Sequence, residues 1–318
     1  MAEPAARAAE KPSLHPAKRA WAIVNPVSGR HDVDETSAEL RSVLDEYASD
    51  VEVRVTAEGG DAYRWAAEAA DEGVDLLVVV GGDGTVAAVL DGARRGAEPV
   101  PVAIVPMGTA NGVARAVGIP ATGSGVLPSL LEGRVVPIDL FEVESSGRAF
   151  VLFLGAGFDA EINDDTARES KSRFGPLAYL AAAARRLRGS SRRIEFELEL
   201  DDRSERMRGH SVSVVNAAPV HVVGVAVGPD ASSTDGRLDV TVLRRTGPIG
   251  VVLDTIDLLT GRAHRTNAMR ARRVTIRATP PLKVHADGDL IGTTPVTVTA
   301  VPQGARLLVP QEAATPPS

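Results

Sequence analysis

The 318-residue chain contains no cysteine, which excludes disulfide bonds and thiolate chemistry and fits a reducing compartment. Aromatic residues make up only 3% of the chain, so few side chains can stack on nucleobases. The net charge is −7, and no overall positive field attracts nucleic acid. No apolar run approaches the ~20 residues that span a bilayer. We therefore expect a cytoplasmic protein without a nucleic-acid partner.

What the chain does have is the composition of a globular protein, with 44% apolar and 24% charged residues. Residues 1–18 and 311–318 are rich in alanine, proline and polar residues and lack a continuous apolar stretch. We expect both ends to be disordered tails.

The first third of the chain alternates strand and helix patterns. Residues 51–55 alternate valine with charged residues, as in a half-buried strand, whereas residues 76–80 are apolar throughout, as in a strand covered on both faces. Helical spacing precedes each of these strands, at 35–47 and 61–71. This alternation predicts a parallel α/β domain over residues 19–137.

The pattern changes near residue 138, after which short strands dominate. Helical patterns interrupt them at about 160–188 and 248–262. Many strands at short spacing predict an antiparallel, β-sandwich-like domain over residues 138–310, whose last segment packs back near the first domain. The predicted strands are 138–143, 150–154, 194–200, 212–215, 238–243, 274–277, 283–286 and 296–301.

The stretch VVVGGDGTVAAVL ends a predicted strand in a turn with almost no side chains. The turn consists of Gly81, Gly82, Asp83, Gly84 and Thr85. In α/β sheets, ligands bind beyond the carboxyl ends of the strands. Glycines let backbone N–H groups approach an anion, and the helix that follows adds its positive N-terminal end. Asp83 can hold a metal ion or a hydroxyl. The alternative is an ordinary glycine turn with an aspartate cap.

Two other predicted strands end in the same kind of residue. VNPVSGR, at 24–30, and VPMGTANGVAR, at 105–115, bring glycine together with hydroxyl and amide side chains. Because three neighbouring strand ends share this chemistry, a phosphate-binding site is the better interpretation. The residues concerned are Asn25, Pro26, Ser28 and Gly29 in the first segment and Gly108, Thr109 and Asn111 in the second.

NPVSG, GGDGT and PMGTAN, in this order and spacing, resemble the diacylglycerol kinase catalytic-domain family. That family includes bacterial lipid kinases and sphingosine kinases, and it shares its nucleotide-binding fold with NAD kinases. The resemblance covers about 20–310, and its downstream part singles out the lipid kinases. That part consists of KSRFGPLAYL (171–180), GPDASSTDGRLDV (228–240), HADGD (285–289) and PQGARLLVP (302–310).

The resemblance implies an ATP-dependent, Mg²⁺-dependent kinase that phosphorylates a hydroxyl of a lipid such as diacylglycerol. It implies that residues 25–29 and 79–85 hold the ATP phosphates, together with Thr109 and Asn111. Thr56 would contact the nucleotide, or else cap the helix at 61–71. Two alternatives stay open, a soluble NAD-kinase-like enzyme and a nucleotide-binding membrane regulator without catalysis.

HADGD offers two carboxylates, Asp287 and Asp289, on either side of a glycine. A tight turn can aim both at one site, where one takes the hydroxyl proton and the other holds Mg²⁺. An ordinary Asp-Gly hairpin turn is the alternative, and Asp83 is a rival for either role. The family usually has glutamate where this chain has Asp289, so this carboxylate reaches about 1.5 Å less far.

The resemblance also implies a structural Mg²⁺ site in the segment 228–240. Asp235 and the Arg237 carbonyl match two of its ligands, but Ser232 stands where an acid is expected. One carboxylate, a hydroxyl and a carbonyl make a weak oxygen cage. An Asp-Gly turn between strands explains these residues equally well.

Basic residues gather among apolar ones at 168–193, with a second cluster at 262–277. Such a stretch can dock on anionic headgroups, and its alternative is a solvated helix face. We therefore expect a lipid substrate at the membrane surface and a peripheral contact with the inner face. The six histidines have no metal-ligand spacing. The sequence leaves open whether the protein forms a homodimer.

Overall fold

The computed structural model describes residues 17–29, 32–120, 123–157, 193–217, 220–222, 225–227, 232–245, 250, 253–254 and 269–313. The helix predicted at about 160–188 therefore lies outside the described residues, and so does most of the one at 248–262. Within the described ranges, no helix combines the length and the apolar character needed to cross a membrane.

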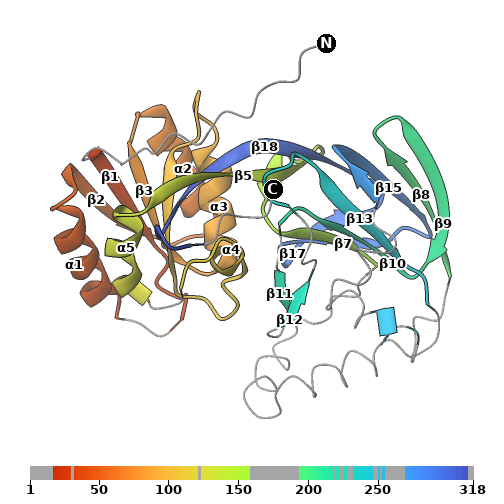
Figure 1. Ribbon diagram of the computed structural model, residues 1–318, viewed down its shortest axis with the longest axis horizontal. Coiled ribbons are helices and arrows are strands. Elements are labelled where there is room, and N and C mark those ends of the chain that lie inside the picture. The colour runs from red at the N-terminus through yellow and green to blue at the C-terminus, as the bar shows by residue number, and fades with distance from the viewer. Residues whose placement is uncertain are drawn as a thin grey trace.

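The first part of the chain forms the parallel α/β sheet that the alternation predicted (Figure 1). Its strands lie in the order β2-β1-β3-β4, and each neighbouring pair is parallel. The strands are β1 (Ala17–Val24), β2 (Ala48–Val55), β3 (Leu76–Gly81) and β4 (Pro101–Pro106). The helices are α1 (Val33–Leu44), α2 (Asp61–Asp71), α3 (Asp83–Ala93), α4 (Gly112–Ala116) and α5 (Leu127–Leu131), with a 3-10 turn at Gly123–Val126.

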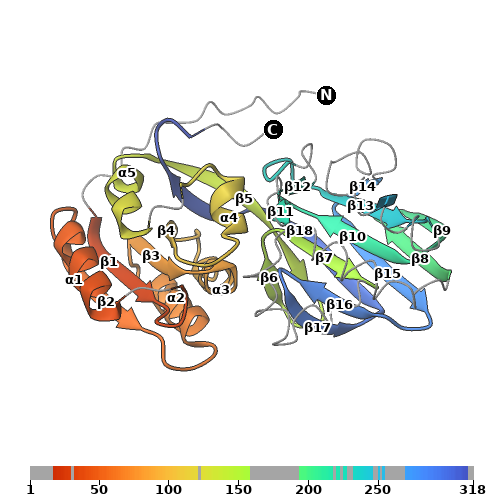
Figure 2. The same cartoon turned by 90° about the horizontal axis from the view of Figure 1, so that it is seen from below.

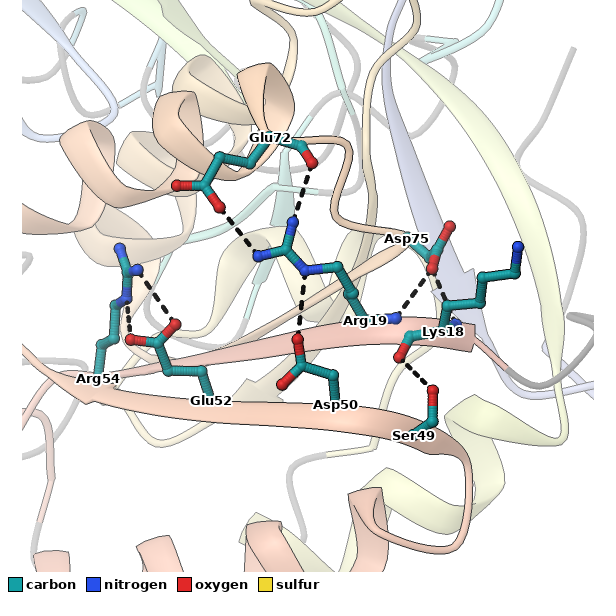
Figure 3. Close-up of polar contacts among 8 residues, drawn as sticks. All are labelled: Lys18, Arg19, Ser49, Asp50, Glu52, Arg54, Glu72 and Asp75. Carbon is teal, nitrogen blue, oxygen red and sulfur yellow. Dashed lines mark hydrogen bonds and ion pairs between the residues drawn. The ribbon is translucent and has the colours of Figure 1, made fainter.

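A polar clamp fixes the amino end of β1 (Figure 3). The Arg19 guanidinium donates to the Asp50 carboxylate at 3.3 Å and to the Glu72 carboxylate at 2.9 Å. The backbone N–H groups of Lys18 and Arg19 both donate to Asp75, at 2.8 and 2.9 Å. These bonds join β1 to β2 and to the loop before β3. They lie at the opposite end of the strands from the three glycine-bearing turns, so they serve the fold.

The second part is built of antiparallel strands, as predicted (Figure 2). Among the described residues, one six-stranded sheet has the order β14-β13-β10-β7-β16-β17. These strands are β14 (Met269–Ala271), β13 (Leu238–Leu243), β10 (Ser211–Val215), β7 (Phe153–Ala156), β16 (Lys283–Ala286) and β17 (Asp289–Thr293). A separate ribbon pairs β11 (Val220–Val222) with β12 (Val225–Val227).

The strand β18 (Val296–Val309) joins the two parts, because it continues the parallel sheet into the second part. Its end pairs in parallel with β4, and its beginning pairs antiparallel with β15 (Arg273–Thr279). Figure 1 shows β18 and β5 (Arg134–Val143) arching together from one part to the other. The remaining strands of this sheet are β6 (Arg148–Phe150), β8 (Ile194–Leu200) and β9 (Arg203–Gly209).

Two separate clusters of buried apolar side chains accompany this arrangement. One is centred on the parallel sheet and contains β3 and β4, and the other fills the space between the antiparallel strands. The first cluster also contains residues from the second part of the chain, among them Leu152, Ala217 and Leu307, so the second part packs onto the parallel sheet. We propose a division into two domains near residue 138, which falls within β5.

The strand patterns failed in two informative places. The stretch 150–154 is not one strand but the end of β6 and the start of β7, with a break at Val151 and Leu152. The pattern also missed β9, an edge strand in which most residues are exposed. Such a strand has no apolar face to reveal it.

Candidate active site

The three glycine-bearing turns meet at the carboxyl ends of β1, β3 and β4. Asn25 donates from Nδ2 to Thr85 Oγ1 at 2.7 Å, and the Gly82 N–H donates to Ser28 Oγ at 3.3 Å. The Asp83 carboxylate accepts the Val113 N–H at 3.1 Å. The first turn is thus bonded to the second, and the second to the third, as expected of one binding site.

Glycine is needed where the second and third turns touch. A Cβ atom on Gly108 would lie 2.6 Å from Gly82 Cα and 2.8 Å from Asn111 Oδ1. Asn111 has a left-handed φ of 48° and donates from Nδ2 to the Gly108 carbonyl at 2.8 Å. Its buried Oδ1 has no hydrogen-bond partner among the described residues. A buried acceptor of this kind fits a donor from a bound molecule.

Asp83 is the first residue of α3, whose N-cap is Gly82. The N–H groups of the first helical turn have no partner within a helix, so they can donate to an anion, and the helix dipole favours one there. A Cβ atom on Gly84 would meet nothing within 4 Å, so the space beside this end of the helix is open to a ligand. The turn GGDGT therefore has the features of a phosphate site.

Thr56 lies beside the first turn. Its N–H donates to the Val24 carbonyl at 2.9 Å, one residue before Asn25. The N-cap of α2 is Gly60, so the alternative that Thr56 caps this helix is wrong. Thr109 is exposed on the third turn.

Asp287 enters from the other part of the chain. Asp287 and Gly288 form the two-residue loop of the hairpin β16–β17, with φ of 48° and 98°. The hairpin alternative is therefore right about the backbone, but it does not account for the side chain. The Asp287 carboxylate accepts three backbone N–H groups, from Val151 at 2.7 Å, Leu152 at 3.0 Å and Phe153 at 2.9 Å.

Burial raises the pKa of Asp287 to about 6, and the nearby charge of Asp83 adds to the rise. The three N–H bonds act in the opposite direction, because they stabilise the carboxylate. A carboxylate with this pKa is ionised at neutral pH and is still basic enough to accept a proton. Asp83 and Asp287, which are far apart in the sequence, are thus electrostatically coupled.

Asp289 has different surroundings from Asp287. It is the first residue of β17, its side chain is 57% exposed, and its Oδ2 lies 3.2 Å from Arg148 Nη2. The Arg148 guanidinium also lies 4.9 Å from the centre of the Phe150 ring. The two acids of HADGD therefore have no polar partner in common among these contacts.

The residues implied for a structural Mg²⁺ ion do not form a cage for it in the described part of the chain. Asp235 accepts the Arg237 N–H at 3.0 Å, and its other oxygen lies 3.6 Å from Arg270 Nη1. Ser232 Oγ accepts the Thr234 N–H at 3.2 Å. A guanidinium beside the single carboxylate disfavours a cation there. We assign no step of the reaction to this site.

Sequence reasoning missed Asp139, a buried acid of the strand β5. Its carboxylate is buried and accepts the Gly236 N–H at 2.6 Å and the Gln303 N–H at 2.8 Å. Burial raises its pKa. The available signal was an acid that directly adjoins Ile138 and Leu140, both buried apolar residues. The N–H donors at 151–153 left no such signal, because they are backbone groups.

The basic stretch at 168–193 lies outside the described residues, apart from Arg193. Of the cluster at 262–277, residues 269–277 are described, and three of their arginines form ion pairs with acids of the protein: Arg270 with Asp239, Arg273 with Glu144 and Arg277 with Glu199.

Comparison with known proteins identifies the family. A model described as "diacylglycerol kinase catalytic domain" matches residues 19–143, and one described as "YegS C-terminal NAD kinase beta sandwich-like domain" matches 153–309. A probable YegS-like lipid kinase of Stenotrophomonas maltophilia is 33% identical over 273 residues, which cover 82% of this chain and 87% of that protein. The chain belongs to the diacylglycerol kinase catalytic-domain family. It is therefore a kinase, and kinases of this family use ATP.

Two further relatives are similar to this chain over nearly its full length. The diacylglycerol kinase of Bacillus subtilis is 27% identical over 302 residues, covering 93% of this chain and 98% of its own. A solved structure of a diacylglycerol kinase from Bacillus anthracis superimposes with a TM-score of 0.76 at 24% identity, covering 92% and 97% of the two chains. This structural likeness confirms the predicted fold class, and the curated relatives confirm the resemblance read from the motifs.

Gly108→Ala should weaken ATP use by this kinase. The added methyl group would force the Gly82 and Gly108 turns apart, and a misplacement of about 1 Å can cost ~10²-fold in rate. We expect the KM for ATP to rise at least about tenfold, as measured by initial rates over a range of ATP concentrations.

Gly125→Ala is the matched control, because a Cβ atom there would meet nothing within 4 Å. It should leave KM unchanged. An unchanged KM for Gly108→Ala would mean that the contact between the two turns does not shape the nucleotide site.

Proposed function

We propose that the protein transfers the γ-phosphate of ATP to a hydroxyl group of a lipid such as diacylglycerol, with Mg²⁺. The observation that carries the proposal is a contact between the two parts of the chain. Residues 151–153 bind the Asp287 carboxylate, and Leu152 of this segment lies at Gly112, beside Asp83 at the helix end of the glycine-bearing turns. Transfer of a phosphoryl group to a hydroxyl requires a site that holds the phosphates and a base that accepts the hydroxyl proton. Here the two would come from different parts of the chain. The names of the curated relatives support a lipid acceptor.

In this proposal the glycine-bearing turns hold the ATP phosphates. Their donors are the N–H groups at the start of α3, helped by Ser28 and Thr85, whose hydroxyl groups lie in the same network. Thr56, Thr109 and Asn111 border the nucleotide. These residues hold the γ-phosphate in line with the incoming hydroxyl. This alignment increases the rate of transfer through proximity and orientation.

Asp287 is the proposed base. Its Oδ1 accepts two N–H groups and its Oδ2 accepts one, so Oδ2 keeps room for a proton. The lipid oxygen forms a bond to the γ-phosphorus while the bond to the β-phosphate oxygen breaks. The hydroxyl proton passes to Asp287, and ADP leaves with the electron pair.

Asp83 fits a Mg²⁺ site, because Mg²⁺ is commonly held by one or two carboxylates together with substrate phosphates. When bound, the ion neutralises negative charge on those phosphates. The basic stretch at 168–193 is the proposed membrane contact of a peripheral enzyme.

Incubating the protein with γ-labelled ATP, Mg²⁺ and single acceptors tests the proposal. The acceptors are dioleoylglycerol, monooleoylglycerol, sphingosine and NAD, with a no-acceptor reaction and Asp287→Asn as controls. Label in a lipid supports the proposal. Label in NAD alone would instead favour the NAD-kinase-like alternative. ATP binding without any transfer would favour the regulator.

Asp289 gives a prediction of its own. We expect Asp289→Glu to keep or raise kcat, and Asp289→Asn to lower it by ~10²-fold, because the amide cannot accept a proton or bind Mg²⁺ well. Exposed ion pairs such as the one with Arg148 contribute at most about 1 kcal/mol to stability, so the fold should survive.

Arg148→Gln is the control, because it breaks the ion pair and keeps the carboxylate. A wild-type kcat for Asp289→Asn would make Asp289 only a residue of the hairpin.

A further inference from the structure

Residues 151–153, the two residues between β6 and β7 and the first residue of β7, form a junction between the two parts of the site. On one side, their three N–H groups all bind the Asp287 carboxylate. On the other, Leu152 reaches the glycine-bearing turns: a Cβ atom on Gly112 would lie 2.8 Å from Leu152 Cδ1 and 3.6 Å from Asp83 Oδ1. The position of this segment therefore determines where Asp287 lies relative to Asp83.

Two carbonyl groups of the same segment, those of Val151 and Leu152, accept hydrogen bonds from Asn216, which directly follows β10. Its Nδ2 donates to the Val151 carbonyl at 2.7 Å, and its backbone N–H donates to the Leu152 carbonyl at 2.9 Å. The second proton of Nδ2 goes to the Asp139 carbonyl at 2.9 Å, in β5. Because both neighbours of Nδ2 are carbonyl acceptors, only one orientation of the amide fits.

Asn216 is 1% exposed, and it ties the segment to the strand that passes between the two parts of the chain. Ordinary β-ladder bonds cannot do this for Val151, because the residue lies in the break between two strands. Without the amide, two buried carbonyl groups would lose their donor, and the segment could shift to find others.

We propose that Asn216 is a positioning residue of the kinase: its amide holds residues 151–153 in place and thereby sets the position of the Asp287 carboxylate. The proposal rests on the role of Asp287 proposed above. The printed bonds of the Asn216 amide all go from Nδ2 to backbone carbonyl groups, and its buried Oδ1 has no hydrogen-bond partner among the described residues. The effect of Asn216 passes through the backbone of the segment.

The test compares Asn216→Leu, which keeps the size and removes the donors, with Asn216→Ser, whose hydroxyl can donate once. Val214→Ala is the control for general loss of stability, because Val214 is fully buried in the same strand and makes none of these bonds. Two quantities are measured: hydrogen exchange at the amides of 151–153 relative to those of β3, and kcat and KM for ATP with dioleoylglycerol in micelles.

In Asn216→Leu we expect exchange at 151–153 to become at least about tenfold faster relative to β3, since loss of local hydrogen bonds lowers the local opening free energy. We expect kcat to fall ~10–100-fold while KM for ATP changes less than about twofold, because the phosphate turns are intact. Asn216→Ser should lie between wild type and Asn216→Leu in both measurements. If Asn216→Leu does not fold, Asn216→Ser decides by the same criteria.

Relative exchange at 151–153 that matches Val214→Ala would overturn the positioning role, and so would a kcat no lower than that of this control. A wild-type kcat in Asp287→Asn would instead overturn the role of Asp287, and this proposal with it. The two failures are thus distinguishable, because the exchange measurement does not depend on Asp287 chemistry.

Discussion

Asp287→Asn should lower kcat by ~10²–10⁴-fold, which is the usual loss when a general base is removed. The amide has the same shape as the carboxylate, but it cannot take the hydroxyl proton. The measurement is initial-rate kinetics with the acceptor that the label experiment identifies. The matched control is Asp45→Asn, an exposed acid at the end of α1, which should leave kcat unchanged.

The pKa of about 6 gives this prediction a pH signature. The wild-type kcat should fall as the pH is lowered through about 6, because Asp287 becomes protonated. The residual activity of Asp287→Asn should lack this decline. A wild-type rate in the variant, or an unchanged acid limb, would remove Asp287 from the role of base.

The same shift predicts how Asp287 affects stability. Its pKa is raised above the ordinary value of 3.8, so between about 4 and 6 the folded protein holds a proton that the unfolded chain has lost. The contribution of Asp287 to the free energy of unfolding therefore decreases as the pH rises through that window, and it stays lower at neutral pH. Asp287→Asn removes this cost, but its NH2 group replaces an oxygen that accepts a buried N–H, which is then left without an acceptor. We therefore expect a lower Tm at pH 7.5, and kcat is to be measured at a temperature at which thermal unfolding shows the variant to be folded.

Asp83→Asn and Asp83→Ala should both lower kcat by ~10²-fold or more, because charge at the phosphate turn is lost. Asparagine keeps an oxygen that can accept the Val113 N–H, whereas alanine does not, so only alanine should also loosen the contact between the second and third turns. We therefore expect the KM for ATP to rise more in Asp83→Ala than in Asp83→Asn. Initial-rate kinetics and thermal unfolding measure both effects.

The coupling between the two acids adds a second readout for Asp83. The charge of Asp83 helps to raise the pKa of Asp287, so in protein without Mg²⁺ the Asp287 pKa should be lower in Asp83→Asn than in the wild type, as measured by NMR titration of the Asp287 carboxyl carbon. A wild-type kcat in Asp83→Asn would show that the charge of Asp83 is not needed. An unchanged Asp287 pKa would show that the two carboxylates do not interact.

Much of the phosphate side of the site could be predicted from the sequence. The alternation of strands and helices gave the parallel sheet, and the carboxyl ends of its strands must meet at one edge. Asn25, Thr85 and Asp83 are consequently joined in one network, although 60 residues separate the first two. Periodicity and turn chemistry are local properties, so a single sequence carries them.

The other side of the site was decided by tertiary structure. HADGD marked Asp287, but the groups that bind it lie about 135 residues away and are backbone N–H groups, which every non-proline residue has. The same holds for Asn216, whose bond to Val151 spans 65 residues. Strand patterns even merged β6 and β7 into one, which hid the break at 151–153 that the carboxylate occupies.

The sequence alone determined the fold class, the family and the three glycine-bearing turns, because each depends on the order and spacing of neighbouring residues. Only the tertiary structure decided that Asp287 and Asp289 have different partners, that Asp83 is close enough to shift the pKa of Asp287, and that Asn216 supports the segment between them. These relations depend on how the antiparallel strands pack against the parallel sheet. Packing brings together residues whose separation in the chain carries no pattern.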